Sequence, residues 1–432
     1  MGERRKRTAA RPPREPAMAS QADQDNPREK GGEAEERFAS PVNLEVAAAA
    51  PGEFAALDLG TFAVWPPVVL APMAGVTNYP FRRLCRDFGA GLYVSEMITA
   101  RGYLNGNRLT RLLASSQPDE NPRSVQIYGA DPIDVHDMAR ELVGEGVQHI
   151  DMNFGCPVPK VTRSGGGSAV PLKPRLLARL VRAAVRGAGD VPLTIKVRKG
   201  IDDSLETYLD AGRVAQEEGA RAIGLHARTA AQLYSGEADW NAIGTLVEHL
   251  SIPVLGNGDI WESWDALRMM RHTGCAAVIV GRGCLGRPWL FRELAQVFEG
   301  QEADPPPNFG QVCEVLFEHA RMLVDFFGET IGIRQMRKWC TWYTVGFRHS
   351  SRARGDLVRV STLEEIRAIL ARGDVDEPFP RAALRAHRAK GGRTQRVILP
   401  EGYLESRDDD SPPKGPRTPA EIEAWEKALQ GG

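Results

Sequence analysis

Short apolar segments alternate with amphipathic helical patterns from residue 68 to residue 280, and this alternation constrains the fold more than any other feature of the chain. The strand-like segments are residues 68–70, 92–94, 124–127, 149–152, 193–196, 222–225, 254–256 and 277–280. Helical patterns lie between most of them, at residues 134–143, 174–185, 208–217 and 264–271. Eight strands with interposed helices favour an α/β fold of the (β/α)8 type, a TIM barrel, over a doubly wound sheet. In such a barrel the active site lies at the carboxyl ends of the strands.

The segments outside this alternation differ from it in composition. We expect a disordered extension at 1–40, a barrel domain at 60–305, a smaller all-helical domain at 309–372, and a basic segment with a largely disordered tail at 373–432. The extension is almost empty of large apolar side chains, so it cannot bury enough surface to offset the entropy cost of ordering. The tail from about 404 to 420 is rich in Pro, Asp and Gly, with a short helix expected at 421–429.

Charge and cysteine usage narrow the classes of function. Lys and Arg number 55 and Asp and Glu 56, so the whole chain indicates no polyanionic partner. Residues 334–396, however, carry 15 Lys and Arg against 6 Asp and Glu, an excess of nine positive charges. That excess indicates a nucleic-acid surface, with a solvated helical surface as the alternative. The six cysteines show no C-x-x-C pair and no zinc-like spacing with histidine, so we expect a reducing cytoplasm and no metal. No apolar stretch approaches a membrane span, and we expect no membrane association.

A single cysteine stands in a position that favours chemistry. Cys156 follows the strand-like segment 149–152 in the turn Asn153-Phe154-Gly155-Cys156-Pro157. A thiol there lies at the carboxyl end of a barrel strand, where side chains from separate strands converge on a substrate. The alternative is a buried structural thiol, because free cysteine packs as a small hydrophobic residue. The ends of the other strands favour the first interpretation.

Those other strand ends carry residues suited to a flat ring and to a phosphate. The small residues of segment 71–77, Ala-Pro-Met-Ala-Gly-Val-Thr, would let a flat ring approach the backbone. Gln126 and Lys196, near the tips of two strands, are costly in a barrel interior without partners, and a flavin offers partners to both. For Lys196 the alternative is a rim lysine whose ammonium reaches solvent. The segments 257–260 and 281–283 follow the last two strands, where barrels of this type bind phosphate through glycine amides and a cation.

At these positions the sequence resembles a known family. The run 151–157, with Pro159-Lys160-Val161 after it, is similar to the signature of the tRNA-dihydrouridine synthases, and most of all to the bacterial B-type branch. Further segments resemble the remaining blocks of that family in the same order, at residues 71–77, 95–97, 196–198, 226–229, 257–260 and 281–283. The resemblance covers roughly residues 66–345.

The resemblance implies an FMN enzyme that reduces the C5–C6 double bond of selected uridines in tRNA, with NADPH (or NADH) as reductant. Hydride would pass from flavin N5 to uracil C6, and Cys156, as the catalytic proton donor, would protonate C5 from the opposite face. The implied cofactor-binding residues are Pro72, Met73, Ala74, Gln126, Lys196, His226, Arg228, Asn257, Gly258, Asp259, Gly281 and Arg282. The implied substrate contacts are Asn153 and, in the helical domain, Arg334, Arg337 and Lys338. We expect a monomer.

Two other functions remain open. A flavin barrel acting on a free pyrimidine, similar to a dihydroorotate dehydrogenase, would need no basic helical region. A non-catalytic RNA-binding barrel would need neither Cys156 nor Lys196. The tryptophans interleaved with the basic residues, Trp339 and Trp342, are expected to be core residues of the helical domain rather than stacking platforms for RNA.

Overall fold

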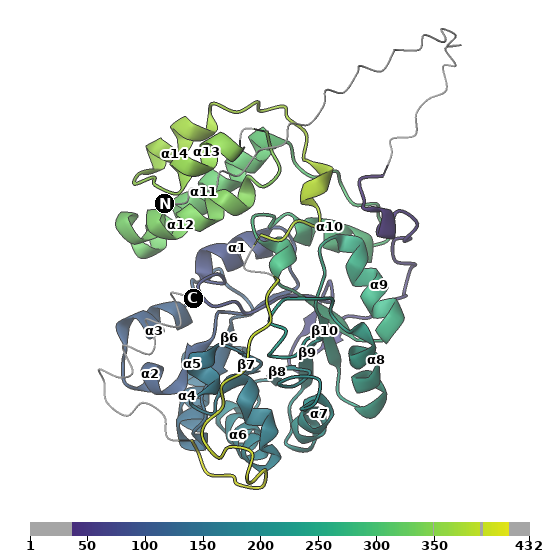
Figure 1. The fold of residues 1–432 in the computed structure, drawn as a ribbon, viewed down its shortest axis with the longest axis vertical. Helices are drawn as coiled ribbons and strands as arrows, with labels where there is room; N and C mark the ends of the chain where they lie inside the picture. Colours follow the sequence, from purple (N-terminus) through teal and green to yellow (C-terminus); the bar gives the residue numbers. More distant parts are fainter. Residues whose placement is uncertain (1–36, 349, 389–391, 414–432) are drawn as a thin grey trace, which may run out of the picture. The chain divides into compact units, whose positions relative to one another are not determined.

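The computed structural model describes residues 37–348, 350–388 and 392–413 (Figure 1). Most of the extension expected at 1–40 lies outside the described residues, which start at residue 37. The last part of the expected tail and the short helix expected at 421–429 also lie outside them.

Parallel strands curl into the barrel that the alternation predicts. They are β3 (Val68–Leu70), β4 (Leu92–Tyr93), β5 (Ile98–Thr99), β6 (Ser124–Tyr128), β7 (His149–Phe154), β8 (Leu193–Arg198), β9 (Ala222–His226), β10 (Val254–Asn257) and β11 (Ala277–Val280). Their order in the sheet is β4-β3-β11-β10-β9-β8-β7-β6-β5. Nearly all of their residues are buried, as expected for parallel strands covered on both faces. The (β/α)8 fold is confirmed.

The second strand of the barrel is interrupted. Its first part, β4, pairs with β3, and its second part, β5, pairs with β6. Ser95 lies between the two parts and joins them to the next strand: its N–H donates to the Ser124 carbonyl and its hydroxyl accepts from the Gln126 N–H, both at 3.1 Å. The barrel therefore closes through a side chain as well as through backbone pairing.

Helices cover the outside of the barrel, and their apolar faces explain why they form there. The helices are α1 (Tyr79–Asp87), α2 (Ala100–Leu104), α3 (Arg108–Ala114), α4 (Pro132–Gly144), α5 (Pro159–Thr162), α6 (Pro174–Ala188), α7 (Tyr208–Glu217), α8 (Trp240–His249), α9 (Ser263–Thr273) and α10 (Leu290–Phe298). In α6, Leu176, Leu180 and Ala184 recur every four residues and are fully buried. Each buried leucine of this kind stabilises the fold by roughly 1.5–3 kcal/mol.

A short hairpin closes the amino-terminal end of the barrel. It consists of β1 (Leu57–Asp58) and β2 (Ala63–Val64), which pair antiparallel. Leu57 and Val64 belong to an apolar cluster with Ala222 and Ala277, the first residues of β9 and β11. Because this end is filled, the carboxyl end of the strands is the face left for a site.

In the part of the chain that the structure describes, four α-helices follow the barrel where the sequence predicts a helical region. They are α11 (Phe309–Phe327), α12 (Glu329–Tyr343), α13 (Ser350–Leu357) and α14 (Leu363–Leu370). Trp339 of α12 is fully buried, and its ring centroid lies 4.4 Å from that of Phe81 in α1. His319 of α11 stacks on the same Phe81 ring at 5.6 Å. The expectation that Trp339 is a core residue is confirmed, and the core it belongs to is shared with the barrel.

Residues 392–413, the C-terminal segment, have no regular secondary structure but contact the barrel (yellow in Figure 1). Val397, Leu399 and Tyr403 pack in a small apolar cluster with residues of the barrel loops. Composition predicted a disordered tail from about 404, yet the Asp409 carboxylate lies 2.6 Å from the Lys173 ammonium. The acidic residues that made the tail look disordered have basic partners on the barrel. Among the described residues, no helix is long and apolar enough to cross a bilayer.

Candidate active site

Cys156 lies just beyond the end of β7, at the carboxyl end of the barrel. Its thiol is partly buried. The Asn153 side chain forms the turn, because its Oδ1 accepts from the N–H groups of Gly155 at 3.1 Å and Cys156 at 2.9 Å. Burial raises the pKa of the Cys156 thiol, and the opposing effects of the Val158 N–H and of Arg198 are smaller. The thiol is therefore protonated at neutral pH and can donate a proton.

A run of three glycines lets the chain after Cys156 fold back against it. The Ser168 N–H donates to the Cys156 carbonyl at 3.1 Å. Gly167 has a φ of +54°, and a Cβ there would lie 2.5 Å from that same carbonyl oxygen. A Cβ on Gly166 would lie 2.0 Å from the Tyr128 hydroxyl oxygen. No side chain fits at either position while the loop keeps this shape.

A chain of hydrogen bonds links the Cys156 turn to the barrel interior. Asn153 Nδ2 donates to Gln126 Oε1 at 2.8 Å, and Gln126 Nε2 donates to Asp151 Oδ2 at 2.7 Å. The other Asp151 oxygen accepts from the Thr194 hydroxyl, which also contacts His149. Gln126 was predicted near a strand tip, but it lies in the middle of β6 and is fully buried. The network fixes which way its amide points.

Asp151 is the carboxylate of this network, and sequence reasoning did not single it out as a site residue. Burial raises its pKa to about 6, although the hydrogen bonds from Thr194 and Gln126 and the charge of Lys196 all act in the opposite direction. The signal in the sequence was an acidic residue within the apolar run 149–152. Such a residue is expected to be buried and to need partners.

Lys196 lies opposite Asn153 of this network in the pairing of β7 with β8. It lies in the middle of β8 rather than at its tip, and its ammonium donates to Asn257 Oδ1 at 2.8 Å. Asn257 is held in turn by the Ile279 carbonyl, to which its Nδ2 donates at 2.7 Å. Burial, and to a smaller extent the charge of Arg198, lower the Lys196 pKa to about 7, although the charge of Asp151 acts in the opposite direction. An anion bound beside Lys196 would keep it charged.

The guanidinium groups of Arg228 and Arg282 meet at Asp259 beyond the ends of β9, β10 and β11, and a third guanidinium group belongs to Arg198, the last residue of β8. Asp259 accepts from Arg228 at 2.7 Å and from Arg282 at 3.4 Å, and Arg198 Nη1 donates to the Thr229 carbonyl at 3.0 Å. Arg228 is 1% exposed, and its Nη1 has no hydrogen-bond partner among the described residues. Burial, then the charges of Arg198, Lys196, Arg228 and Arg282, lower the pKa of His226 well below its usual value, so this ring is neutral. The cations in this region outnumber its one carboxylate, Asp259, so the excess positive charge could bind an anion.

Two glycines expected at a phosphate site lie in the same region. Gly258 follows β10 with a φ of +138°, and a Cβ there would lie 2.5 Å from the Ala238 Cβ. Gly281 directly follows β11, and the nearest atom to a Cβ at that position is the Ala71 Cβ at 3.7 Å. Local packing therefore excludes a side chain at Gly258, whereas a Cβ at Gly281 would make only an ordinary van der Waals contact.

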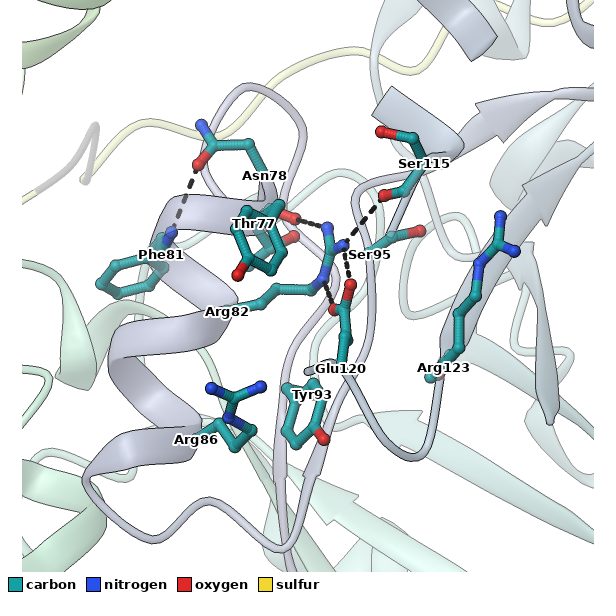
Figure 2. Close-up of polar contacts among 12 residues, drawn as sticks. Thr77, Asn78, Phe81, Arg82, Arg86, Tyr93, Ser95, Ser115, Glu120 and Arg123 are labelled. Carbon is teal, nitrogen blue, oxygen red and sulfur yellow. Dashed lines mark hydrogen bonds and ion pairs between the residues drawn. The ribbon is translucent and has the colours of Figure 1, made fainter. Parts of the chain in front are cut away.

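The loop after β3, with Pro72, Met73 and Ala74, is held by a buried ion pair (Figure 2). Arg82 of α1 forms two hydrogen bonds with the Glu120 carboxylate and donates from Nη1 to the Thr77 carbonyl at 2.9 Å. Both partners of the pair are almost inaccessible to solvent. Pro72 also lines a small cavity inside the barrel, together with Asp151, Lys196 and Gly224.

The three basic residues expected to bind RNA have different surroundings in the structure. Arg334 is exposed on α12. Arg337 Nε donates to the Val360 carbonyl at 3.0 Å within the helical region. Lys338 is partly buried and reaches the barrel, where its ammonium donates to the Gly75 carbonyl. Burial lowers the Lys338 pKa, with the neighbouring Glu96 acting in the opposite direction.

The predicted site residues therefore form two groups. Around the Cys156 turn lie Asn153, Gln126, Lys196 and Asn257, and around Asp259 lie His226, Arg228 and Arg282. Within the part of the chain that the structure describes, no three His, Cys, Asp or Glu side chains are placed to hold a metal ion.

A protein family and several known proteins match most of the chain. Residues 69–381 match the family described as dihydrouridine synthase (Dus). A probable tRNA-dihydrouridine synthase of Mycobacterium tuberculosis (strain ATCC 25618 / H37Rv) is 50% identical over 371 residues, which cover 83% of this chain and 95% of that protein. The corresponding protein of Mycobacterium leprae (strain TN) is 48% identical, covering 80% and 98%. A tRNA-dihydrouridine synthase B of Pseudomonas syringae pv. tomato is 41% identical over 288 residues, covering 67% and 85%.

Proposed function

Because the chain belongs to the dihydrouridine synthase family, we propose that it reduces the C5–C6 double bond of uridines in tRNA, with FMN as cofactor and Cys156 as proton donor. The observation that carries this proposal is the placement of Cys156. A thiol whose pKa is raised by burial lies at the carboxyl end of the barrel, in one hydrogen-bonded framework with Gln126. A structural cysteine would need neither the turn nor that framework.

Residues within the barrel strands and just beyond their ends fit FMN. The partnerless Nη1 of Arg228 and the cations around Asp259 suit a phosphate. Lys196 and Gln126 would hold the pyrimidine edge of the ring. The remaining contacts are proposed for Pro72, Met73, Ala74, His226, Asn257, Gly258, Gly281 and Arg282. FMN, when bound and reduced by NADPH, would supply the hydride that goes to uracil C6.

In the proposed reaction, the protein's own residues hold the proton donor and the target uracil in place. Cys156 would give its proton to uracil C5 on the face opposite the flavin, and the raised pKa keeps that proton available. Asn153 holds the turn through its Oδ1 and bonds Gln126 through its Nδ2. Its other amide contact is only to the Met97 sulfur at 3.6 Å, and the target base would replace that weak contact.

The uridine must leave its stack to reach the barrel mouth, which requires a grip on the RNA outside the site. Arg334, exposed on α12, is the residue of the helical region that we propose for this grip. Arg337 and Lys338 already have partners within the protein, so their proposed role is to hold α12 in position.

The test is to purify the full chain, identify its flavin and assay tRNA. We expect FMN rather than FAD on denaturation, and dihydrouridine in tRNA after incubation with NADPH, located by nuclease digestion and mass spectrometry. Activity on free uracil or orotate without activity on tRNA would instead support a pyrimidine reductase. A protein that binds no flavin after reconstitution would overturn the proposal.

A further inference from the structure

The C-terminal segment contacts the loop that carries Cys156, although it lies beyond the family match, which ends at residue 381. Gln395 makes the first contact. Its side-chain Nε2 donates to the carbonyls of Pro157 at 2.8 Å and Ala230 at 3.2 Å. Its backbone N–H donates to the Ala231 carbonyl at 2.8 Å. Gln395 therefore ties the residue after Cys156 to the loop that follows β9.

Tyr403 makes the second contact, at the other end of the same loop. Its hydroxyl donates to the Gly165 carbonyl at 3.2 Å, and its ring is buried in the cluster that contains Ala169 and Leu172. The Lys173 ammonium lies 4.5 Å from the centre of the ring. Gln395 and Tyr403 thus hold the two ends of the stretch Pro157–Gly165.

Further contacts anchor the segment on both sides of Tyr403. Before it, Val397 and Leu399 pack against the same cluster. After it, Arg407 Nε donates to the Leu172 carbonyl at 3.3 Å, and Asp409 pairs with Lys173 at 2.6 Å. The segment is held over its length and can act as a fixed support for the loop.

Cys156 is consequently held from two directions. On one side Asn153 binds the N–H groups of Gly155 and Cys156, and on the other Gln395 binds the Pro157 carbonyl. We propose that the C-terminal segment is a positioning element of the tRNA half-reaction, acting through Gln395 and Tyr403 on the Cys156 loop. This inference rests on the proposed function and deepens it. A glycine-containing loop has many accessible conformations, and restraining both ends selects the one that presents the thiol.

The test compares the full-length double variant Gln395→Ala/Tyr403→Phe with wild type. Tyr403→Phe keeps the buried ring and removes only the hydroxyl, and Gln395→Ala removes the side-chain amide that makes both hydrogen bonds while keeping the backbone N–H that bonds Ala231. Thr394→Ala, at an exposed neighbouring position, is the matched control. We expect normal flavin content and normal flavin reduction by NADPH, while flavin reoxidation by saturating tRNA slows by about 10- to 100-fold, the size of effect expected from misplacing a catalytic group.

A second measurement reports on the loop without using the flavin. Hydrogen exchange in peptides spanning residues 158–166 should be faster in the double variant than in wild type, and unchanged in Thr394→Ala. Equal reoxidation rates in the double variant and wild type would overturn the inference. So would an equal slowing of both half-reactions with a lowered Tm, since that result describes general destabilisation. If wild type itself fails to react with tRNA, the proposed function falls, and the exchange comparison still decides whether the segment restrains the loop.

Discussion

At the scale of single residues, burial acts in opposite directions on the two groups closest to the proposed chemistry. It raises the pKa of the Cys156 thiol and lowers that of the Lys196 ammonium to about 7. In both cases the neutral form is favoured, because a buried charge loses its hydration. For Cys156 the neutral form is the useful one, since a proton donor must carry its proton. For Lys196 the neutral form is the poorer binder of an anion, so ligand binding and protonation of Lys196 are coupled.

Replacing Cys156 should separate the two half-reactions. In Cys156→Ala, flavin binding and NADPH oxidation should stay near wild type, while flavin reoxidation by tRNA falls by about 10²–10⁴-fold, the usual contribution of a general acid. Lys196→Ala should instead weaken flavin retention or slow both half-reactions. Cys313→Ala, at the other partly buried thiol, on α11, is the control and should change neither. Rapid-mixing measurements of flavin absorbance follow each step, and a Cys156→Ala enzyme that reoxidises at the wild-type rate would contradict the assignment.

The pH dependence of the tRNA half-reaction should follow the acid form of Cys156. Burial raises the thiol pKa above its ordinary value of 9.0, so the protonated fraction is nearly complete at neutral pH and declines only as pH rises through the raised pKa. The rate constant for reoxidation should therefore be level from about pH 7 to about pH 9 and fall above that. A rate that increases with pH over this range would indicate a thiolate mechanism instead. Single-turnover reoxidation at each pH makes the measurement.

At the scale of elements, α12 presents a basic side chain to solvent at one position and contacts the barrel at another. Its exposed Arg334 is available to a partner, whereas Lys338, one turn later, contacts the Gly75 carbonyl and lies near the buried Glu96. Glu96 also accepts from the Gly75 N–H at 2.8 Å. The loop after β3 is therefore held on both sides of Gly75, once by the barrel and once by the helical region.

Arg334 and Lys338 should consequently respond differently to substitution. Arg334→Ala should weaken tRNA binding and reduce the slope of log affinity against log salt by about 0.7–0.9, the change expected for one lost phosphate contact. Lys338→Ala should leave that slope unchanged and lower the free energy of unfolding by about 1–3 kcal/mol, because it leaves buried polar groups without a partner. Titrations of tRNA at several salt concentrations, with urea unfolding alongside, distinguish the two. An unchanged slope in Arg334→Ala would mean that RNA binds elsewhere.

At the scale of the whole molecule, the helical region and the barrel are joined by a common core. Phe81 of the barrel stacks with His319 and Trp339 of the helices, and Arg287 donates to the Leu384 carbonyl at 2.7 Å beyond them. Some of the basic side chains counted after residue 334 also form ion pairs or hydrogen bonds within the protein. Arg385, for example, contacts both Glu262 and Asp265. The sequence count of nine excess charges therefore overstates what faces a partner.

This shared core changes what truncation should do. From sequence alone, a chain ending after Gly310 would keep a flavin-binding barrel and lose only tRNA binding. The structure predicts instead that this chain loses stability and aggregates, since it exposes Phe81. Trp339→Ala in the full chain should lower the free energy of unfolding by about 3–5 kcal/mol, the usual cost of a deleted core aromatic. Urea unfolding measures it, and a truncated barrel that is soluble with an unchanged Tm would show that the two regions are independent.

The sequence by itself determined the barrel, the helical region after it and the place of Cys156 at the end of a strand. These follow from local patterns, because the repeat of apolar residues and the turn after a strand are set within a few residues. Gln126 and Lys196 were also predicted as buried polar residues, since a polar group within an apolar strand requires a partner wherever the strand lies.

Only the tertiary structure decided which residues are the hydrogen-bond partners of these polar side chains. Gln126 bonds Asp151, 25 residues away, and Gln395 bonds Pro157, 238 residues away. Lys338, which the sequence places among the predicted RNA contacts, donates to the Gly75 carbonyl, 263 residues away. Such contacts depend on how the barrel closes and on which surfaces the later segments cover. No local pattern encodes them, because each is selected by the packing of elements that are distant in the chain.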